Sequence, residues 1–458
     1  MSNEVKDWVA KEFETLDFNS ERLNKRFKIA LSDMSNQTDK SIWLASGSRT
    51  NAKAVYRMIA NKKCTPQDIL TAHINATTNR SKNKNTLLAV QDTMAVNYAN
   101  HTKTEGLGYN CELTRGINVH TCLLLTPQGI PLGILTQNTI TRSNPKNNQN
   151  TPHQKRLRPI EEKESYRWLQ TMQTAKNNAP KQAKLIHIAD REGDMYELYS
   201  LAAQIGEQFI IRSKFDRLDT EKNLVLQTLR NSIPIGKTVV NLPANRKIKT
   251  KERDVVLTVQ YGVFDVARSR CYVTKETPSS LKLTLVRLFE EQPLDGVDAI
   301  EWVLMTNLEV KGVDDALLVG EYYKHRWKIE RFHFVLKSGC MIEKIQQRSL
   351  AGIELVILMY SIISVHVMQL TFLARSAPDL SCGLVFGESE WKLLYRAANH
   401  THVDPLVCPS MVEAVGLVAR IGGFVGAKSD GPPGLKVIWV GLNKFYVLMA
   451  YRDAFSCF

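Results

Sequence analysis

TLLAVQD, residues 86–92, is an apolar run that closes on an aspartate. Downstream, Val119–Leu125 and Ile130–Leu135 flank a Pro-Gln-Gly turn, a pattern that predicts a hairpin. Lys184–Ile188 is a fourth apolar run, and Asp190 follows it closely. Short apolar runs bounded by turn residues predict buried strands. This part of the chain therefore predicts a sheet whose first and fourth strands each end at an acidic residue.

The segment after the fourth strand alternates between helix and strand. A helix over about 194–205 and a strand at Phe209–Ile211 come first. From about 215 to 294 the pattern becomes β-rich around a basic turn, and we interpret this part as an insertion. Glu301–Thr306 predicts a further strand, and Val313–Ser338 predicts one long helix. The expected fold class is therefore α/β.

The first 70 residues predict small amphipathic helices. Apolar side chains recur at helical spacing from Ser20 to Ser35, with basic residues mostly off that stripe. A second helix places Arg49, Lys53 and Arg57 at i, i+4 and i+8. Such a row of like charges destabilises a helix unless an anion lies along it. A solvated helix face and a nucleic-acid contact both remain open for this row.

The overall charge indicates a polyanionic partner. Among 458 residues, Lys and Arg total 60 and Asp and Glu total 46, which gives a net charge of +14. Nucleic acid is the first expectation for such a basic protein, and an anionic membrane surface is the second. A composition of 43% hydrophobic and 23% charged residues is that of a globular protein, which excludes a disordered tail.

The cysteines and the apolar runs of the sequence indicate the cellular compartment of the protein. The eight cysteines form no C-x-x-C pair, so neither a zinc finger nor a disulfide framework is expected. The N-terminus has no apolar core of a secretion signal. The apolar tract Leu355–Val365 is too short to span about 30 Å of hydrocarbon, and we interpret it as a buried core helix. A reducing cytoplasm fits these features best.

Three carboxylates stand where strand ends and a helix could converge. They are Asp92, Asp190 and Glu330. Acidic residues after strands are common as helix caps, and Asp194 is expected to cap the helix that follows it. Carboxylates are also hard oxygen ligands, which Mg²⁺ prefers, and here they occur in a basic protein. Two Mg²⁺ ions about 4 Å apart can catalyse phosphodiester chemistry.

The most specific spacing of candidate functional residues lies on the expected long helix. Tyr323, Arg326, Glu330 and Lys337 follow one another at offsets of 3, 7 and 14, which fall on one face of a regular helix. An aromatic ring, a guanidinium, a carboxylate and an ammonium would then form a row. A salt-bridged surface between Arg326 and Glu330 would explain part of the same pattern.

These motifs resemble those of the DDE transposases of bacterial insertion sequences. The likeness is to the insertion-sequence-4 family with its Y-R-E-K signature, and within it to the transposon-5 type. It extends in order over nearly the whole chain, although 376–410 matches poorly. The matching segments are LLAVQDTMAVNY around Asp92, INVHTCLLL around His120, IHIADREGDMYEL around Asp190, FIIRSK at Phe209–Lys214, EWVLMT at Glu301–Thr306, YKHRWKIERFHFVLKSG at Tyr323–Gly339, and ARIGGF at Ala419–Phe424.

The resemblance implies an RNase H-like catalytic core with a β-rich insertion, flanked by N-terminal and C-terminal helical regions. The implied domains are residues 1–78 for binding DNA ends, 79–375 for the core with its insertion at about 215–300, and 376–458 for dimerisation. It implies that Asp92, Asp190 and Glu330 bind Mg²⁺, with Mn²⁺ as a substitute. The implied activity is cut-and-paste transposition: hydrolysis of one strand, hairpin formation, and joining of 3′-OH ends to target DNA.

The resemblance also implies DNA contacts. Tyr323, Arg326 and Lys337 would handle the transposon end, and Trp302 would fill the gap left by a flipped base. Partners would be double-stranded DNA at transposon ends and target sites, and a second protomer in a synaptic complex, with the protein in the bacterial cytoplasm at the nucleoid. Further expected DNA-binding residues are Arg57, Arg26, Lys40, Lys53, Arg212 and Lys214.

Two other functions stay open at this point. A host nuclease of the same fold would keep the acids, but would have no need of Trp302 or of the row from Tyr323 to Lys337. A regulator of transposition would bind DNA without cutting it. The intact N-terminal basic helices and the three acids speak against that regulator.

Overall fold

The computed structural model describes residues 5–143, 151, 154, 158–242, 252–269, 277–293, 296–427 and 431–455. The basic turn expected at Arg246–Lys251 lies outside these residues. The chain forms two compact units. Unit 1 comprises residues 1–84, 93–148 and 328–458, and unit 2 comprises residues 85–92 and 149–327. The domain boundaries expected from the resemblance stay predictions.

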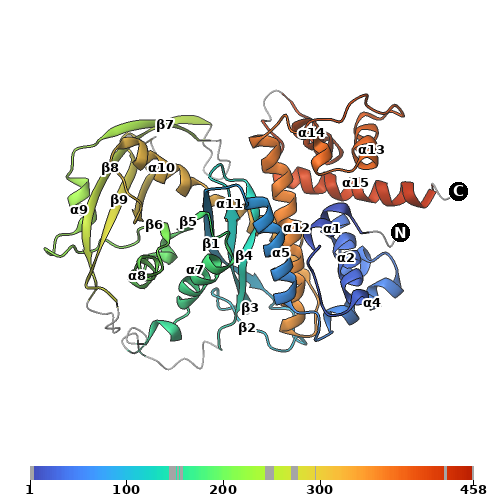
Figure 1. Ribbon diagram of the computed structural model, residues 1–458, viewed down its shortest axis with the longest axis horizontal. Coiled ribbons are helices and arrows are strands. Elements are labelled where there is room, and N and C mark those ends of the chain that lie inside the picture. Colours follow the sequence, from blue (N-terminus) through green and yellow to red (C-terminus); the bar gives the residue numbers. More distant parts are fainter. Residues whose placement is uncertain are drawn as a thin grey trace. The chain divides into compact units, whose positions relative to one another are not determined.

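Unit 2 is built on a mixed sheet with the strand order β1-β5-β6-β10-β9-β8-β7 (Figure 1). The first part of β1 pairs in parallel with β5, and β5 pairs in parallel with β6. Strand β10 is antiparallel to both β6 and β9, so the inserted strands extend the same sheet. The strands are β1 (Thr86–Asn97), β5 (Lys184–Ala189), β6 (Gln208–Arg212), β7 (Gly236–Leu242), β8 (Arg253–Ala267), β9 (Ser280–Glu290) and β10 (Glu301–Thr306).

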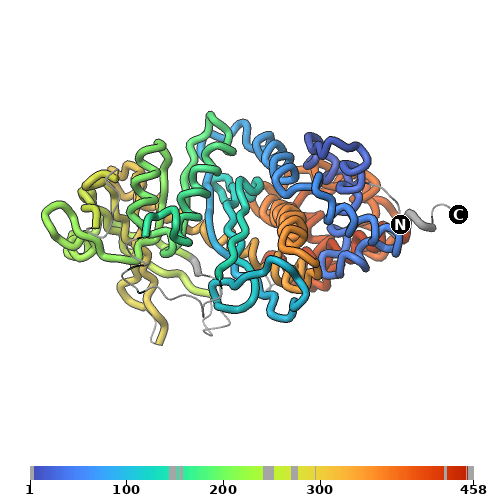
Figure 2. The backbone as a smooth tube through the Cα atoms, turned by 90° about the horizontal axis from the view of Figure 1, so that it is seen from below, coloured from blue at the N-terminus to red at the C-terminus, as the bar shows by residue number. Residues whose placement is uncertain are grey.

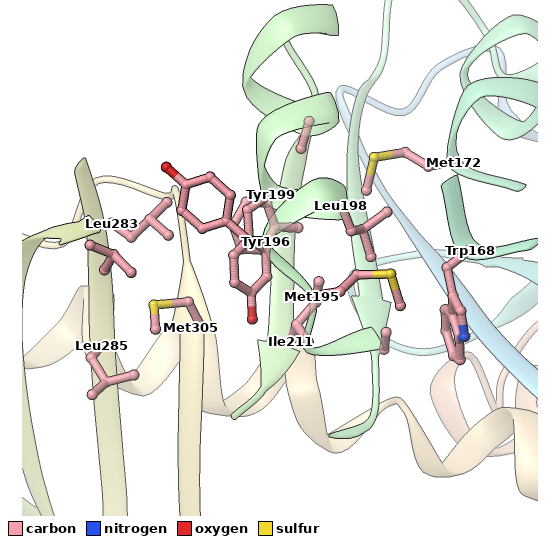
Figure 3. Packing of buried hydrophobic residues seen from close by; sticks show 14 of the residues in the cluster. Trp168, Met172, Met195, Tyr196, Leu198, Tyr199, Ile211, Leu283, Leu285 and Met305 are labelled. Atoms are coloured by element: carbon pink, nitrogen blue, oxygen red, sulfur yellow. The ribbon is translucent and has the colours of Figure 1, made fainter. Parts of the chain in front are cut away.

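Helices cover this sheet and close its hydrophobic core. Trp168 of α7 (Tyr166–Asn178) and Tyr196 of α8 (Tyr196–Ile205) are fully buried with Met305 of β10 in one cluster (Figure 3). Burying a large apolar side chain contributes roughly 1.5 to 3 kcal/mol, so this cluster fixes the helices on the strands. The unit also contains η2 (Ile160–Glu162), η3 (Arg191–Gly193), α9 (Val225–Arg230) and α10 (Val313–Lys324).

Unit 1 contains the expected hairpin. Strand β3 (Arg115–Leu125) pairs antiparallel with β4 (Pro131–Ile140) and with β2 (Gly108–Tyr109). Gly129 takes a positive φ of 77° in the turn between β3 and β4, a conformation that favours glycine. The later part of β1 belongs to this unit and lies beside β3 in the strand order. This mixed α/β architecture, with helical regions before and after it, is consistent with the expected RNase H-like core.

The N-terminal helices form as the sequence predicts. The helix expected at Ser20–Ser35 is α2, which begins at Glu21 with Ser20 as its N-cap residue, and the row of basic residues lies on α4. The Thr65 side chain caps α5 by accepting from the Asp68 N–H, with Pro66 at the first helical position. The five helices are α1 (Asp7–Glu12), α2 (Glu21–Asn36), α3 (Ile42–Ala45), α4 (Arg49–Ile59) and α5 (Pro66–Ser81).

Helix α12 (Leu350–Ser376) is the central element of unit 1. It contacts α2, α4, α5 and β4 as well as two C-terminal helices, and Figure 2 views it nearly end on. It is the one described helix long and apolar enough to cross a membrane, and 78% of its most apolar window is buried. The expectation of a buried core helix is confirmed. The elements that follow it are η6 (Cys382–Leu384), α13 (Glu388–Asn399), α14 (Met411–Ile421) and α15 (Leu435–Phe455).

The single long helix expected at Val313–Ser338 is wrong. Helix α10 ends at Lys324, and α11 (Trp327–Phe334) begins after a turn at His325 and Arg326. The N–H groups of these two residues bond to carbonyls three residues earlier, which tightens the chain and ends the first helix. Three short elements precede α12: α11, the π-helical turn η4 (Val335–Gly339) and η5 (Ile342–Lys344).

Candidate active site and nucleic-acid interface

Asp92 and Asp190 come from neighbouring parallel strands. The register of β1 and β5 pairs Val90 with Ile188, and each aspartate lies two residues further along its own strand or just beyond it. Both side chains are partly exposed. The expectation that the first strand ends at Asp92 is wrong, because β1 continues to Asn97. The two carboxylates therefore lie at the same end of the paired strands β1 and β5, at the point where the pairing stops.

Arg326 contacts the first of these aspartates. Its Nη1 lies 3.9 Å from Asp92 Oδ2, and the two side chains are only 16% and 18% exposed. Arg326 occupies the turn that ends α10, so the break in the expected long helix is what carries the guanidinium to β1. Partial burial weakens the competition from water, and this ion pair is stronger than an exposed one.

Tyr323 and Trp302 are packed together beside this ion pair. Their rings meet edge to face at 5.7 Å between centroids, with Trp302 half-buried at the start of β10 and Tyr323 buried at the end of α10. Burial raises the pKa of the Tyr323 phenol, an effect that the nearby Arg326 and Arg212 cations oppose. Asp190 acts in the opposite direction and raises the pKa of Tyr323, so the phenol lies within electrostatic reach of Asp190, Arg212 and Arg326.

Two buried donor atoms at this place, on neighbouring side chains, lack an acceptor. Neither the Tyr323 hydroxyl nor Nε of Arg212 has a hydrogen-bond acceptor among the described residues. Arg212 ends β6 and holds the Glu301 carbonyl with its Nη2, at 3.0 Å. Buried polar groups are ordinarily satisfied, so both donor atoms are available to an oxygen acceptor.

Asp194 was expected to cap a helix, but Asp190 is the aspartate that does so. Asp190 caps η3, because its carboxylate accepts the Glu192 N–H at 2.8 Å. Asp194 makes no such bond to α8, whose N-cap is Met195. Its fully buried carboxylate instead accepts from the Tyr199 hydroxyl and the Phe215 N–H and pairs with Arg217. Asp194 thus anchors the loop after β6, and the capping expectation was wrong.

Glu330 and Lys337 belong to unit 1. Glu330 lies in the first turn of α11 and is partly exposed. Lys337 lies in η4, and its Nζ is 3.6 Å from Glu343 Oε1. The helix break means that the regular spacing expected from Tyr323 to Lys337 is not present. A π-turn is frequent at functional sites, and here it follows directly after the helix that carries Glu330.

The donor chemistry fits a divalent cation. Carboxylate oxygens are the ligands that Mg²⁺ prefers, and Asp92 and Asp190 supply them from adjoining strands. Within the described ranges, no group of three or more His, Cys, Asp and Glu side chains is close enough to hold a metal ion. The structure therefore brings two of the three expected ligands to one edge, and Glu330 remains an expected third ligand.

A second feature is a basic cavity of about 810 Å³ within unit 1. Arg57 at the end of α4, Lys103 in the loop after β1 and Arg348 before α12 all line it. Backbone bonds hold these walls together, with the Glu105 N–H donating to the Arg348 carbonyl and the Leu350 N–H donating to the Glu105 carbonyl. No acidic side chain is among the lining residues, so the cavity suits an anion.

The sequence pointed to Arg57 but not to Lys103 or Arg348. Each of the latter is an isolated cation in a polar segment, and only the folded chain brings them beside α4. The other expected DNA-binding residues lie elsewhere. Lys53 is exposed on α4, Arg26 is partly buried on α2, Lys40 pairs with Asp39, and the Lys214 amine lies over the Phe215 ring.

Two family models match this chain at opposite ends. One, described as transposase DNA-binding, covers residues 5–64 and so includes α1 to α4. The other, described as the transposase Tn5 dimerisation domain, covers residues 362–456 and so includes the second half of α12 and the three helices after it. The basic cavity takes one wall from the first matched region.

Proposed function

Because this chain belongs to the Tn5-type transposases of the insertion-sequence-4 family, we propose that it cuts its own element from DNA and joins the ends to a target. The family matches establish a transposase with a DNA-binding and a dimerising region. The chemistry we add is hydrolysis of one strand, attack of the freed 3′-OH on the opposite strand to give a hairpin, and transfer of the reopened end.

The observation that carries this proposal is the cluster at one edge of unit 2. Asp92 and Asp190 face the same neighbourhood as the orphaned donors of Tyr323 and Arg212. Carboxylates bind cations, whereas a phenol hydroxyl and a guanidinium N–H that lack an acceptor can donate to phosphate oxygens. The combination is what a phosphodiester with its counter-cation requires.

Each residue then has a role that its contacts support. Asp92, Asp190 and Glu330 would hold Mg²⁺ or Mn²⁺, which supplies a Lewis acid and an activated attacking oxygen. Arg326 is already close to Asp92. Its positive charge would offset the Asp92 carboxylate first and then the phosphate that approaches the site. Tyr323 and Arg212 would orient the phosphate by donating to its oxygens, and Lys337 would add a further positive charge.

The direct test uses DNA that carries the ends of the element in which this gene resides. Purified protein and Mg²⁺ should produce nicked DNA first and hairpin-ended DNA later, with both products absent when EDTA replaces the metal. Binding without any cleavage under these conditions would favour a transposition regulator, and cleavage of DNA lacking the ends at equal rate would favour a general nuclease.

Trp302 is expected to act in hairpin formation. Its half-buried ring, supported edge-on by Tyr323, would stack in place of an extruded base. Base stacking on an aromatic ring contributes about 1 to 3 kcal/mol, so Trp302→Ala should slow hairpin formation roughly ten- to hundredfold. Gel analysis of the nick-to-hairpin ratio measures this effect.

A matched variant separates stacking from packing. Trp302→Phe keeps an aromatic face and should restore most of the hairpin product. If Trp302→Ala instead lowers the melting temperature strongly and slows nicking and hairpin formation equally, Trp302 is a core residue and its stacking role is wrong.

Arg57 is expected to contact the transposon end through the basic cavity. Arg57→Ala should weaken binding to the end by about 1 to 3 kcal/mol and reduce the slope of log affinity against log salt by about 1. Fluorescence anisotropy over a series of salt concentrations measures both quantities.

Lys436→Ala is the control, because Lys436 is exposed on α15 and does not line the cavity. It removes the same charge and should leave binding to the end nearly unchanged. Equal losses for the two variants, on end DNA and random DNA alike, would show that only net charge matters.

A further inference from the structure

Two thiols lie side by side in the C-terminal part of unit 1. Sγ of Cys382 is 3.6 Å from Sγ of Cys408, although the residues are 26 positions apart. The backbones around them are already paired, since the Cys382 N–H donates to the Pro409 carbonyl at 2.9 Å and Ser381 forms an antiparallel bridge with Ser410. A disulfide needs sulfurs about 2.05 Å apart on adjacent backbones, so only a small side-chain movement separates this pair from a bond.

Hydrogen bonds hold the Cys408 side chain between Ser381 and the Pro409 carbonyl. The Ser381 hydroxyl donates to Cys408 Sγ at 3.3 Å, and the Gly383 N–H in turn holds Ser381 Oγ at 3.2 Å. Gly383 also leaves space there, because a Cβ at this position would lie 3.4 Å from Cys408 Sγ.

The two cysteines differ in access. Cys408 is partly exposed, whereas Cys382 is completely buried. Burial raises the pKa of the Cys382 thiol to about 12. An oxidant in solution therefore meets Cys408 first, and Cys382 is placed to react second.

We propose that Cys382 and Cys408 form a site of reversible thiol oxidation that closes an intramolecular disulfide within the dimerisation region. The site takes a low-molecular-weight disulfide, such as oxidised glutathione, as its oxidant. The 3.6 Å sulfur pair between two bridged backbone segments is the observation that carries this proposal.

The reaction consists of two balanced exchanges. Cys408 thiolate attacks one sulfur of the oxidised glutathione, which forms a Cys408–glutathione bond and releases one glutathione thiol. The Cys382 sulfur then attacks Cys408 Sγ, loses its proton to solvent, and releases the second glutathione thiol. The protein loses two electrons and two protons, and one glutathione disulfide becomes two thiols.

The new bond would restrain a defined part of the fold. It would tie η6 to the segment before α14 and enclose α13 together with the loop that follows α13. That loop exposes Val403, Leu406 and Val407, with Leu406 fully accessible. Closing it removes conformational freedom from the unfolded chain and from the loop, so the oxidised protein is the more stable form.

The experiment treats the purified full chain with oxidised glutathione under native conditions and compares it with protein kept in dithiothreitol. Peptide mapping should find Cys382 and Cys408 in one cross-linked peptide pair, and the native chain should lose the mass of two hydrogens at this pair. The melting temperature should rise by about 5 °C, and chymotryptic cleavage after Leu406 should slow at least severalfold.

Single serine variants test the order of attack. Cys382→Ser should leave Cys408 as a stable mixed disulfide with glutathione, and Cys408→Ser should leave Cys382 unmodified. Cys111, which is exposed and outside the pair, provides the reference for general glutathionylation. The proposal is overturned if the wild-type chain shows no bond between Cys382 and Cys408, or if Cys408→Ser becomes modified at Cys382 as readily as Cys382→Ser does at Cys408.

Discussion

Asp92→Asn, Asp190→Asn and Glu330→Gln are each expected to abolish cleavage of transposon ends while leaving end binding nearly unchanged. Each substitution removes one negative charge and almost no volume. A carboxylate that holds a divalent cation loses most of its affinity when it becomes a neutral amide, because hard cations require charged oxygen ligands. The basic cavity around Arg57 has no acidic wall residue, so DNA binding there should not depend on these acids.

Cleavage assays with Mg²⁺ and anisotropy with labelled ends measure the two properties separately. Glu192→Gln is the matched control, because Glu192 lies two residues after Asp190 and its exposed carboxylate pairs with Arg167. This control should cut at the wild-type rate. If any of the three amide variants also does, that residue is not a metal ligand. Raised Mg²⁺ or Mn²⁺ that partly restores a variant would support direct ligation.

Local patterns were sufficient to predict most strands. Lys184–Ala189 and Glu301–Thr306 lie within one residue of their expected bounds, because each is a short apolar run that ends at polar residues. The same reasoning identified α12, whose apolar length exceeds what a surface helix carries. The pairing of β10 with both β6 and β9 could not be predicted, since a run of apolar residues does not specify its neighbours.

At the candidate site, helical spacing in the sequence did not predict the structure correctly. Tyr323, Arg326 and Lys337 sit at helical offsets, but α10 ends at Lys324 and Lys337 falls in a π-turn. Helical periodicity in the sequence did not predict the turn after α10. Tertiary contacts favour this turn, because it buries Tyr323 against Trp302 and brings Arg326 to Asp92. Long-range contacts of this kind outweigh local propensity.

Asp194 illustrates the same limit for charges. Its position before a helix predicted a cap, and the structure uses it to bind Arg217 and the loop after β6. Lys103 and Arg348 are a second example, because cations far apart in sequence line one cavity. Sequence identifies residue types that can act, whereas the fold decides which of them act together.

Glu12→Gln is expected to be among the most destabilising single substitutions in unit 1. The Glu12 carboxylate is only 9% exposed and lies 2.5 Å from Nδ1 of His73 and 2.6 Å from Nη1 of Arg80. His73 Nε2 accepts the Ile134 N–H at 2.8 Å, so its Nδ1 carries the proton that it donates to Glu12. These contacts join α1, α5 and β4, and losing the charge leaves Arg80 without its buried partner.

The size and pH dependence follow from the pKa of Glu12. Burial alone would raise this pKa, but His73 and Arg80 together outweigh burial and lower it from 4.5 to about 2. A difference of this size corresponds to roughly 3 kcal/mol of stability at neutral pH. Since the folded pKa lies below the unfolded one, the contribution is fully present above about pH 5 and is lost as the pH falls toward 2.

Urea unfolding at several pH values measures this contribution. The midpoint difference between wild type and Glu12→Gln should be large at pH 7, shrink through pH 4 and become small near pH 2, because about half of the folded wild-type carboxyls are neutral at that pH. Glu14→Gln is the control, since Glu14 is exposed two residues away and should leave the midpoint almost unchanged. A constant difference between wild type and Glu12→Gln from pH 7 to pH 2 would mean that packing, and not the charge of Glu12, stabilises the junction of α1, α5 and β4.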